Sequence, residues 1–330
     1  MIQKLGKTLN KVGINGFLLG IFAAIFLGYL IPDFGSDASI VPWKPIINVG
    51  IALVFFFYGV KLDPVQLKAG LSNWKLHVLI QISTYLIFPS LVLLVFSVFP
   101  FLNEDFKLGV TYLSILPSTV SASVVMVSIA GGNLPGAIFN ASISSLLGVV
   151  ITPAWLGFLV DGTDLQMDFL PTLGELSLKV LLPVFLGIFS HRWLFPLIKS
   201  KIGKVKYLDQ TVIMIIVYTS FAQSFSQGVF APYKITTLVE ISVTMLLLFL
   251  LIWGIIEILS RVLKFSREDR ITSLFCGSKK SLVQGVVMGK VIFPDPAMLA
   301  LVLLPVMLYH IQQLIAGSII ASSMARKSRI

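Results

Sequence analysis

The stretch FCGSKKSLVQG, residues 275–285, places two adjacent lysines inside an apolar run, residues 271–291. A run of that length is close to what a helix needs to cross about 30 Å of hydrocarbon. Counted from Arg270 at 1.5 Å per residue, Lys280 lies about 15 Å deep, near the midplane. A lysine at that depth costs at least about 2.5 to 3.5 kcal/mol. We therefore expect Lys280 to face the interior of a helix bundle, and Lys279 to fill a hydrated vestibule.

The composition of the whole chain is that of an all-α polytopic membrane protein. Apolar side chains make up 56% of its 330 residues and charged ones only 12%, whereas a soluble domain is about a quarter charged. Mean hydropathy is +0.95. Apolar runs of membrane-spanning length alternate with short charged segments. They predict ten transmembrane helices, at residues 14–31, 44–60, 75–98, 107–131, 133–158, 173–194, 211–231, 236–260, 271–291 and 297–320.

The lysines and arginines between these spans indicate the orientation of the chain. With the N-terminus in the cytoplasm, most of them fall in cytoplasmic segments, as the positive-inside rule requires. The exceptions are Lys44, Lys107, Lys234 and Lys290. The first span is too long for the apolar region of a signal peptide, so we interpret it as uncleaved. We expect a bacterial inner-membrane protein with both termini in the cytoplasm.

Several classes of function are excluded by what the sequence contains. The net charge of +10 is spread over short loops and forms no patch for nucleic acid. Cys276 is the only cysteine, and His77, His191 and His310 are too scattered for a metal site. No nucleotide loop or nucleophile motif occurs, and no acid and base pair at one depth. We therefore expect no enzyme, no resident cofactor and no structural metal.

The chain divides into two halves of similar pattern, residues 1–160 and 161–330, with five predicted spans each. The fourth span of each half is interrupted by polar residues: KLGVTYLSILPSTVSASVVMVSIAGGN, residues 107–133, and RITSLFCGSKKSLVQGVVMGK, residues 270–290. Because five is odd, the halves cross the membrane in opposite directions, which makes an inverted repeat. Pro117 lies about 15 Å along a helix from Lys107, so both interruptions reach the midplane.

Both interrupted spans contain residues that weaken a helix. Pro117 removes an amide donor, and Gly277 with Ser278 precedes the lysines. Paired breaks at membrane depth in an inverted repeat point to a transport site. Taken singly, a proline kink and a snorkelling lysine explain each segment equally well, because Pro and Gly are common in membrane helices. The candidate site residues in the interrupted spans are Pro117, Ser118, Thr119, Ser121, Ser123, Lys279, Lys280, Ser281 and Gln284. Asn140 and Ser144 of the fifth span join them, and Gln81, Thr84, Gln312 and Gln313 are further polar candidates in other spans.

Three segments carry a resemblance to a known family. GVKLDPVQLKAGLSNWKLH (59–77), ILPSTVSASVVMVSIAGGNLPGAIFNASISSLLGVVITP (115–153) and FCGSKKSLVQG resemble the bile acid:sodium symporter superfamily, most closely the branch of the seventh member of solute carrier family ten. The likeness covers nearly the whole chain. It implies two inverted five-helix repeats, with a panel made by helices one, two, six and seven. The other six helices would form a core in which helices four and nine unwind and cross.

The resemblance also implies where ions bind. In sodium-coupled members of the family, two cations lie behind the crossing. By position, the first site falls near Ser123, Val124, Ala137, Ala141 and Lys280, and the second near Gln81 or Thr84, Lys280, Ser281, Val283 and Gln284. Asn140 is a further possible ion-site residue. The glutamate that the family shares between the two sites is replaced here by Lys280. An ammonium at that position repels sodium.

We therefore expect a secondary transporter of an organic solute with altered or absent sodium coupling. A midplane lysine and helix N-termini favour an anion. Two roles for Lys280 stay open: its ammonium replaces sodium and bonds Ser123, Asn140 and nearby carbonyls, or it carries a coupling proton. The alternative function is a non-transporting regulator of calcium homeostasis, because human relatives of this branch are linked to calcium entry. The expected partners are a small solute and the bilayer, and the oligomeric state is left open.

Overall fold

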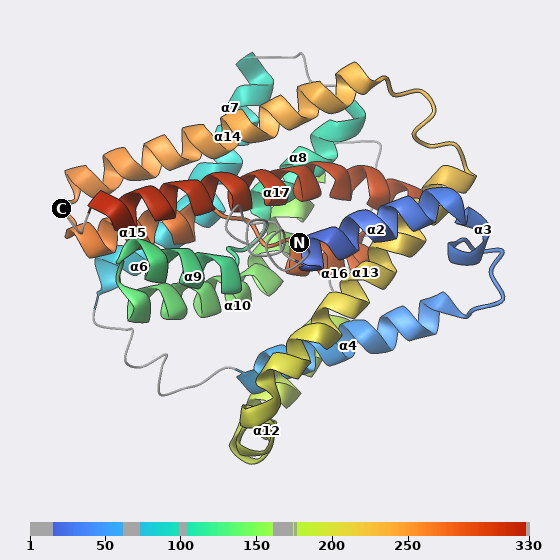
Figure 1. Ribbon diagram of the computed structural model, residues 1–330, viewed down its shortest axis with the longest axis horizontal. Coiled ribbons are helices and arrows are strands. Elements are labelled where there is room, and N and C mark those ends of the chain that lie inside the picture. Colours follow the sequence, from blue (N-terminus) through green and yellow to red (C-terminus); the bar gives the residue numbers. More distant parts are fainter. Residues whose placement is uncertain (1–15, 62–72, 99–103, 161–173, 175–176, 328–330) are drawn as a thin grey trace, which may run out of the picture.

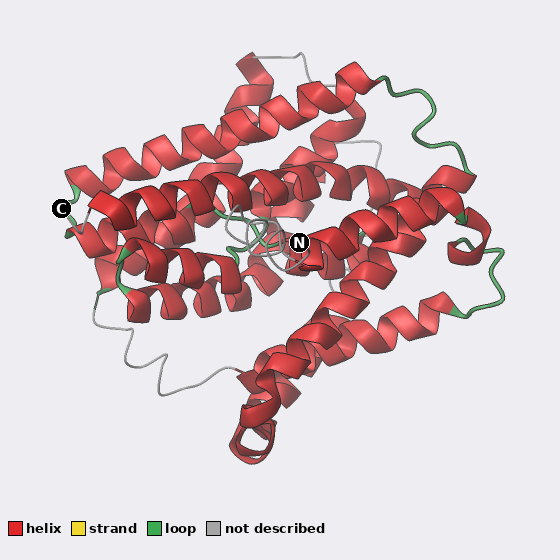
Figure 2. Cartoon of the chain, viewed as in Figure 1, coloured by secondary structure: helices red, strands yellow, loops and turns green. Residues whose placement is uncertain are grey.

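The computed structural model describes residues 16–61, 73–98, 104–160, 174 and 177–327. Within these ranges every regular element is a helix, as predicted (Figure 1, Figure 2). Parts of the first and sixth predicted spans, and residues 62–72 of the first family segment, lie outside them. The elements are α2 (Gly16–Leu30), α3 (Pro32–Gly35), α4 (Trp43–Lys61), α6 (Trp74–Ile82), η1 (Ser83–Ile87), α7 (Phe88–Val98), α8 (Glu104–Ile115), α9 (Ser121–Ala130), α10 (Leu134–Val160), η2 (Ser177–Leu181), α12 (Leu182–Ile198), η3 (Lys199–Lys201), α13 (Ile202–Ser226), α14 (Ile235–Val262), α15 (Arg267–Gly277), α16 (Leu282–Ile292) and α17 (Pro296–Lys327).

Six helical stretches among the described residues are long and apolar enough to cross a membrane. Each coincides with one of the predicted spans. Large apolar side chains on them, such as Phe189 of α12 and Leu251 of α14, are exposed, as is expected where the solvent is lipid rather than water. These helices make the chain a multi-pass membrane protein. The six stretches are Trp43–Lys61, Trp74–Val98, Leu134–Phe158, Leu178–Lys201, Ile235–Val262 and Pro296–Arg326.

The other four predicted spans fall on α2, on α8 with α9, on α13, and on α15 with α16. Helix α2 is described for only 15 residues, and α13 carries Lys204, Lys206 and Asp209 in its first turns. The spans on α8 with α9 and on α15 with α16 are each made of two short helices. The count of ten spans therefore stays a prediction.

Helices α2, α4, α12 and α13 pack against one another and form a first group. Helix α4 lies against α12, and α13 lies against both α2 and α4. The contact between α4 and α12 is close because Gly59 faces Gly187: a Cβ added to Gly59 would come 2.2 Å from the carbonyl oxygen of Val184. Small residues commonly allow membrane helices to approach in this way.

The remaining long helices form a second group with α17 at its centre. Helix α17 contacts α8, α9, α14 and α16 and runs through the middle of the molecule in Figure 1. Tyr112, Phe249 and Tyr309 are among its largest fully buried side chains. The two groups meet where α13 contacts α16 and α17.

Candidate functional site

The chain leaves the helical conformation twice near the centre of the second group. Helix α8 ends at Ile115 and α9 begins at Ser121; α15 ends at Gly277 and α16 begins at Leu282. Pro117 lies in the first interruption, where its ring and missing amide prevent a continuous helix. Ser281 begins α16 as its N-cap, with its hydroxyl oxygen accepting the Gln284 amide.

The two interruptions supply hydrogen-bond partners to each other. The Ser281 amide donates to the Pro117 carbonyl at 2.8 Å. The Ser118 hydroxyl donates to the Cys276 carbonyl at 2.5 Å, and the Ser123 hydroxyl donates to the Phe275 carbonyl at 3.0 Å. Helix ends leave backbone groups unpaired, and each such group costs several kcal/mol where water is absent. The sequence-predicted Pro117, Ser118, Ser123 and Ser281 are thus brought together.

Lys280 joins three segments through its ammonium. Its Nζ lies 2.7 Å from the Thr84 carbonyl oxygen, 2.6 Å from that of Ser114 and 2.8 Å from that of Leu116. The side chain is 1% exposed, and its Nζ lies 4.4 Å from the centre of the Phe88 ring. Three acceptors match the three N–H groups of an ammonium.

The backbone explains why these carbonyls are open to Lys280. Ser114 and Leu116 are at the C-terminal end of α8, where carbonyls have no partner further along the helix and carry the negative end of the helix dipole. Thr84 is in η1, a π-helix, and the wider turn of a π-helix displaces the usual backbone pairing. A helix end and a helix irregularity therefore form one acceptor site for one cation.

Two expected partners of Lys280 bind elsewhere. The Ser123 hydroxyl pairs with Phe275, as above, and with the Thr119 hydroxyl at 2.8 Å. The side-chain amide nitrogen of Asn140 donates to the Gly136 carbonyl at 2.8 Å and lies 2.8 Å from the His77 Nδ1. The expectation that Ser123 and Asn140 hold the ammonium is wrong in this structure. Its three N–H groups are saturated by backbone carbonyls, which are stronger acceptors than shared hydroxyls.

The backbone of Lys280 is held by Gln313, which was predicted from the sequence as a polar candidate in another span but was not assigned to the site. Gln313 of α17 accepts the Lys280 amide at 2.8 Å and donates to the Lys280 carbonyl at 2.7 Å. The Tyr309 hydroxyl donates to the Ser278 carbonyl at 2.6 Å. Tyr309 and Gln313 are four residues apart and so share a helix face. That spacing of two polar groups in an apolar helix was the available signal.

The expectation that Lys279 fills a hydrated vestibule is wrong. Its side chain is 0% exposed, donates to the Met126 sulfur and lies 3.5 Å from the Ala122 carbonyl oxygen. The Phe275 ring is 5.3 Å away. The expectation assumed that both lysines lie on one helix, but residues 278–281 lie between helices. The two side chains therefore enter the protein in different directions, and Lys279 faces α9.

The other predicted residues lie around the two interruptions. Ser144 of α10 accepts the Ser118 amide through its hydroxyl at 3.0 Å and the Tyr85 hydroxyl through its carbonyl. Gln81 of α6 donates to the Asn140 side chain at 3.2 Å, in a cluster one step away from Lys280. Gln284 donates to the Ser145 carbonyl at 3.2 Å. Ser121 begins α9, and its side chain is outside the described part of the structure.

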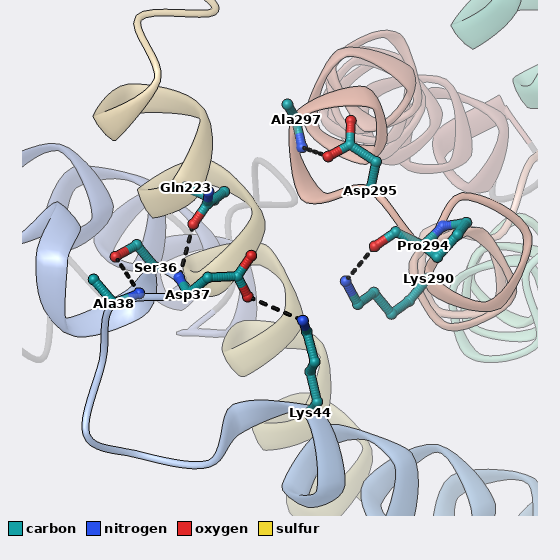
Figure 3. Close-up of polar contacts among 9 residues, drawn as sticks. All are labelled: Ser36, Asp37, Ala38, Lys44, Gln223, Lys290, Pro294, Asp295 and Ala297. Carbon is teal, nitrogen blue, oxygen red and sulfur yellow. Dashed lines mark hydrogen bonds and ion pairs between the residues drawn. The ribbon is translucent and has the colours of Figure 1, made fainter.

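A second polar feature is a cavity of about 270 Å³ at the boundary between the two helix groups. On one side, Asp37 pairs with Lys44 at 3.3 Å, and its amide donates to Gln223 at 2.8 Å. On the other side is Lys290 of α16, which donates to the Pro294 carbonyl at 3.2 Å (Figure 3). Sequence reasoning took Lys44 and Lys290 as orientation signals only. The fold brings both ammonium groups to one cavity, where Asp37 offsets the charge of Lys44 and the charge of Lys290 can attract an anion.

Comparison with known proteins identifies the family to which the chain belongs. Residues 15–326 match the model of the SBF-like CPA transporter family, and the chain belongs to that family. It is 35% identical to protein PA2026 of Pseudomonas aeruginosa, over 95% of this chain and 93% of that protein. It is 33% identical to the "Putative symporter YfeH" of Escherichia coli K12, over 96% and 94%. It is 29% identical to the "Sodium/bile acid cotransporter 7" of Rattus norvegicus, over 95% and 93%.

These relatives confirm the resemblance to the bile acid:sodium symporter branch that the three segments indicated. The family and its named members are transporters, not enzymes. The chain is accordingly a multi-pass membrane transporter, and a transporter implies a small-molecule solute.

Proposed function

We propose that the chain is a secondary active transporter of a small organic anion, in which the Lys280 ammonium replaces the coupling cation of its sodium-dependent relatives. The observation that carries the proposal is the binding of the Lys280 Nζ to the carbonyls of Thr84, Ser114 and Leu116. Backbone carbonyls at the end of one helix and in the irregular turn of another are the ligands that a bound alkali cation would use. Here a covalently attached cation uses them.

The proposed architecture is ten spans in two inverted repeats, residues 1–160 and 161–330. The panel consists of α2, α4, α12 and α13, and the core of α6 to α10 with α14 to α17. Two contacts within the panel, α4 on α12 and α13 on α2, support this division. The fourth and ninth spans are discontinuous, α8 with α9 and α15 with α16, and cross at Pro117 and Ser281. Alternating access is a movement of the panel against the core.

A fixed ammonium changes what drives transport. A sodium ion must bind and leave in each cycle, whereas Lys280 keeps its charge at the crossing throughout. The crossing is then assembled without sodium, and the sodium gradient does no work. An anionic substrate gains attraction to the lysine at low dielectric. A coupling proton carried by Lys280 is the second possibility, and it predicts that a pH gradient drives uptake.

The substrate class follows from the cavity between panel and core. A volume of about 270 Å³ is at the small end for a ligand site. Lys44, Lys290 and Gln223 line it together with Asp37, which pairs with Lys44. The lining therefore carries one net positive charge, that of Lys290. We place this cavity at the outer entrance, since both lysines are in predicted outside segments, and both termini in the cytoplasm of a bacterial cell. A small organic carboxylate fits this size and charge.

Counterflow in proteoliposomes tests the proposal. Vesicles loaded with an organic anion should show saturable exchange with the labelled anion, and the initial rate should be the same in sodium and in choline. The Lys280→Glu variant should become sodium-dependent, because it restores a carboxylate between the carbonyls. Exchange driven by an imposed pH gradient in the wild type would assign a proton role to Lys280. Absence of saturable flux across a broad set of anions would favour a regulator.

A further inference from the structure

We propose that the end of the bundle formed by α14, α15 and α17 holds a binding site for the phosphate head group of an anionic phospholipid. A cavity of about 340 Å³ lies there, lined by Glu257, Arg261, Arg267, Arg270, Trp253 and Met324 among others. The C-terminal end of α14, the N-terminal end of α15 and the C-terminal end of α17 lie together in Figure 1. This site is separate from the crossing and from the cavity at Lys290.

The charges around the cavity are unbalanced. Glu257 pairs with Arg261 at 2.6 Å, and its other oxygen lies 3.6 Å from Arg270. Arg267 donates to the Met324 carbonyl at 3.3 Å. One carboxylate thus faces three guanidinium groups that line the cavity. Each guanidinium has five N–H donors in a planar fork, which suits two oxygens of one phosphate.

The two carboxylates in the first turn of α15, Glu268 and Asp269, do not line the cavity. Asp269 of α15 accepts the side-chain amides of Asn73 and Asn133, at 2.6 and 2.8 Å. Those partners come from the start of α6 and from the turn between α9 and α10, so Asp269 is engaged on another side of α15. The arginines therefore keep a net positive charge toward the cavity.

The surroundings favour a lipid over a soluble phosphate. The cavity has an apolar wall that includes Trp253 and Leu274. On the same helix α14, Ile258 is 63% and Val262 70% exposed, as is expected for side chains in contact with acyl chains. Basic pockets between membrane helices on the cytoplasmic side bind anionic head groups. In the orientation proposed above, this end of the bundle is cytoplasmic.

Binding has a structural consequence for the core. A phosphate bridging Arg261 with Arg267 and Arg270 ties the end of α14 to the start of α15. The last turn of α15 contains Phe275 and Cys276, whose carbonyls accept hydrogen bonds from the hydroxyls of Ser123 and Ser118. An anionic lipid at this site would hold α15 in place, so it should stabilise the folded protein.

The experiment compares purified protein in nanodiscs of phosphatidylcholine with and without phosphatidylglycerol, using the thermal midpoint and native mass spectrometry of retained lipid. The wild type should retain phosphatidylglycerol and melt higher with it. Arg267→Gln combined with Arg270→Gln should lower the affinity at least about tenfold, because two of the three guanidinium groups that would bind the phosphate are removed. Lys199→Gln with Lys201→Gln, exposed basic residues of η3 that do not line the cavity, is the matched control and should match the wild type.

Further measurements distinguish a specific lipid site from misfolded variants, from non-specific lipid retention and from a site for soluble phosphate. Glu257→Gln removes the one carboxylate and should tighten phosphatidylglycerol binding, a gain that misfolding cannot mimic. Equal retention of phosphatidylcholine and phosphatidylglycerol, or equal loss of binding in the η3 control, would overturn the proposal. Stabilisation by inorganic phosphate alone that equals the effect of phosphatidylglycerol would assign the site to a soluble anion and also overturn the lipid proposal.

Discussion

The Nζ of Lys280 lies 2.6 Å from the carbonyl oxygen of Ser114, the residue before the last of α8. A side chain from the second half of the chain therefore closes the end of a helix in the first half. The same ammonium reaches Thr84 and Leu116. One cation thus connects its own segment to two others, η1 and the end of α8, whose three carbonyls would otherwise be unpaired.

Replacing Lys280 with Met should destabilise the protein by about 3 to 5 kcal/mol, because three buried carbonyls lose their only charged partner while the packing volume is nearly kept. Thermal unfolding in detergent measures the effect. Lys234→Met, an exposed lysine before α14, is the control and should leave the midpoint unchanged. An unchanged midpoint for Lys280→Met would remove Lys280 from the support of the crossing.

Lys279→Met should have the opposite outcome from Lys280→Met. Lys279 is fully buried, but its acceptors are a thioether and one distant carbonyl. Replacing a poorly compensated buried charge with an apolar group of similar volume is often neutral or stabilising by about 1 to 4 kcal/mol. The two variants are compared in one thermal-unfolding series. A large loss for Lys279→Met would mean that its charge has a partner beyond those described.

Gln313→Leu should lower stability by about 1 to 3 kcal/mol and abolish transport, since two hydrogen bonds to the Lys280 backbone are lost. Gln312→Leu is the matched control: the neighbouring Gln312 bonds Ser242 of α14 and does not contact the interruption. The Gln312→Leu variant should be less stable than the wild type but should still exchange the anion across the membrane. Equal transport in both variants would show that the position of Lys280 does not depend on Gln313.

Lys290→Gln should raise the KM for anion uptake with little change in the maximal rate. Its ammonium attracts the substrate at the cavity but does not contact the crossing, and such steering weakens as salt rises. Uptake measured at low and high ionic strength should show the largest difference between variant and wild type at low salt. Lys234→Gln controls for the general loss of one positive charge. A fall in the maximal rate alone would place Lys290 in a later step.

Sodium should not stabilise the wild-type protein. With Lys280→Glu, the thermal midpoint should rise with sodium concentration, because a ligand that binds only the folded state stabilises it by mass action. Choline at equal ionic strength is the control for salt. A sodium-dependent midpoint in the wild type would show that a cation binds despite Lys280, and the replacement proposal would fail.

The sequence alone was sufficient for the fold class and the approximate helix positions, because the length and apolarity of a run are set by the bilayer and are readable without contacts. It also placed interruptions at Pro117 and before Lys280, since proline and glycine act locally on the backbone. The family followed from the same residues. Six of the predicted spans were found as long apolar helices.

Only the tertiary structure decided the partners. Lys280 bonds carbonyls rather than Ser123 or Asn140, Lys279 is buried against Met126, and Gln313 holds the second interruption. These outcomes depend on where helix ends meet in space. Because every residue carries the same backbone carbonyl, the residue types in a sequence do not show which carbonyls will accept a hydrogen bond from a lysine. The pattern of side chains therefore predicted two lysines within a membrane span, and the packing of helices determined what each of them binds.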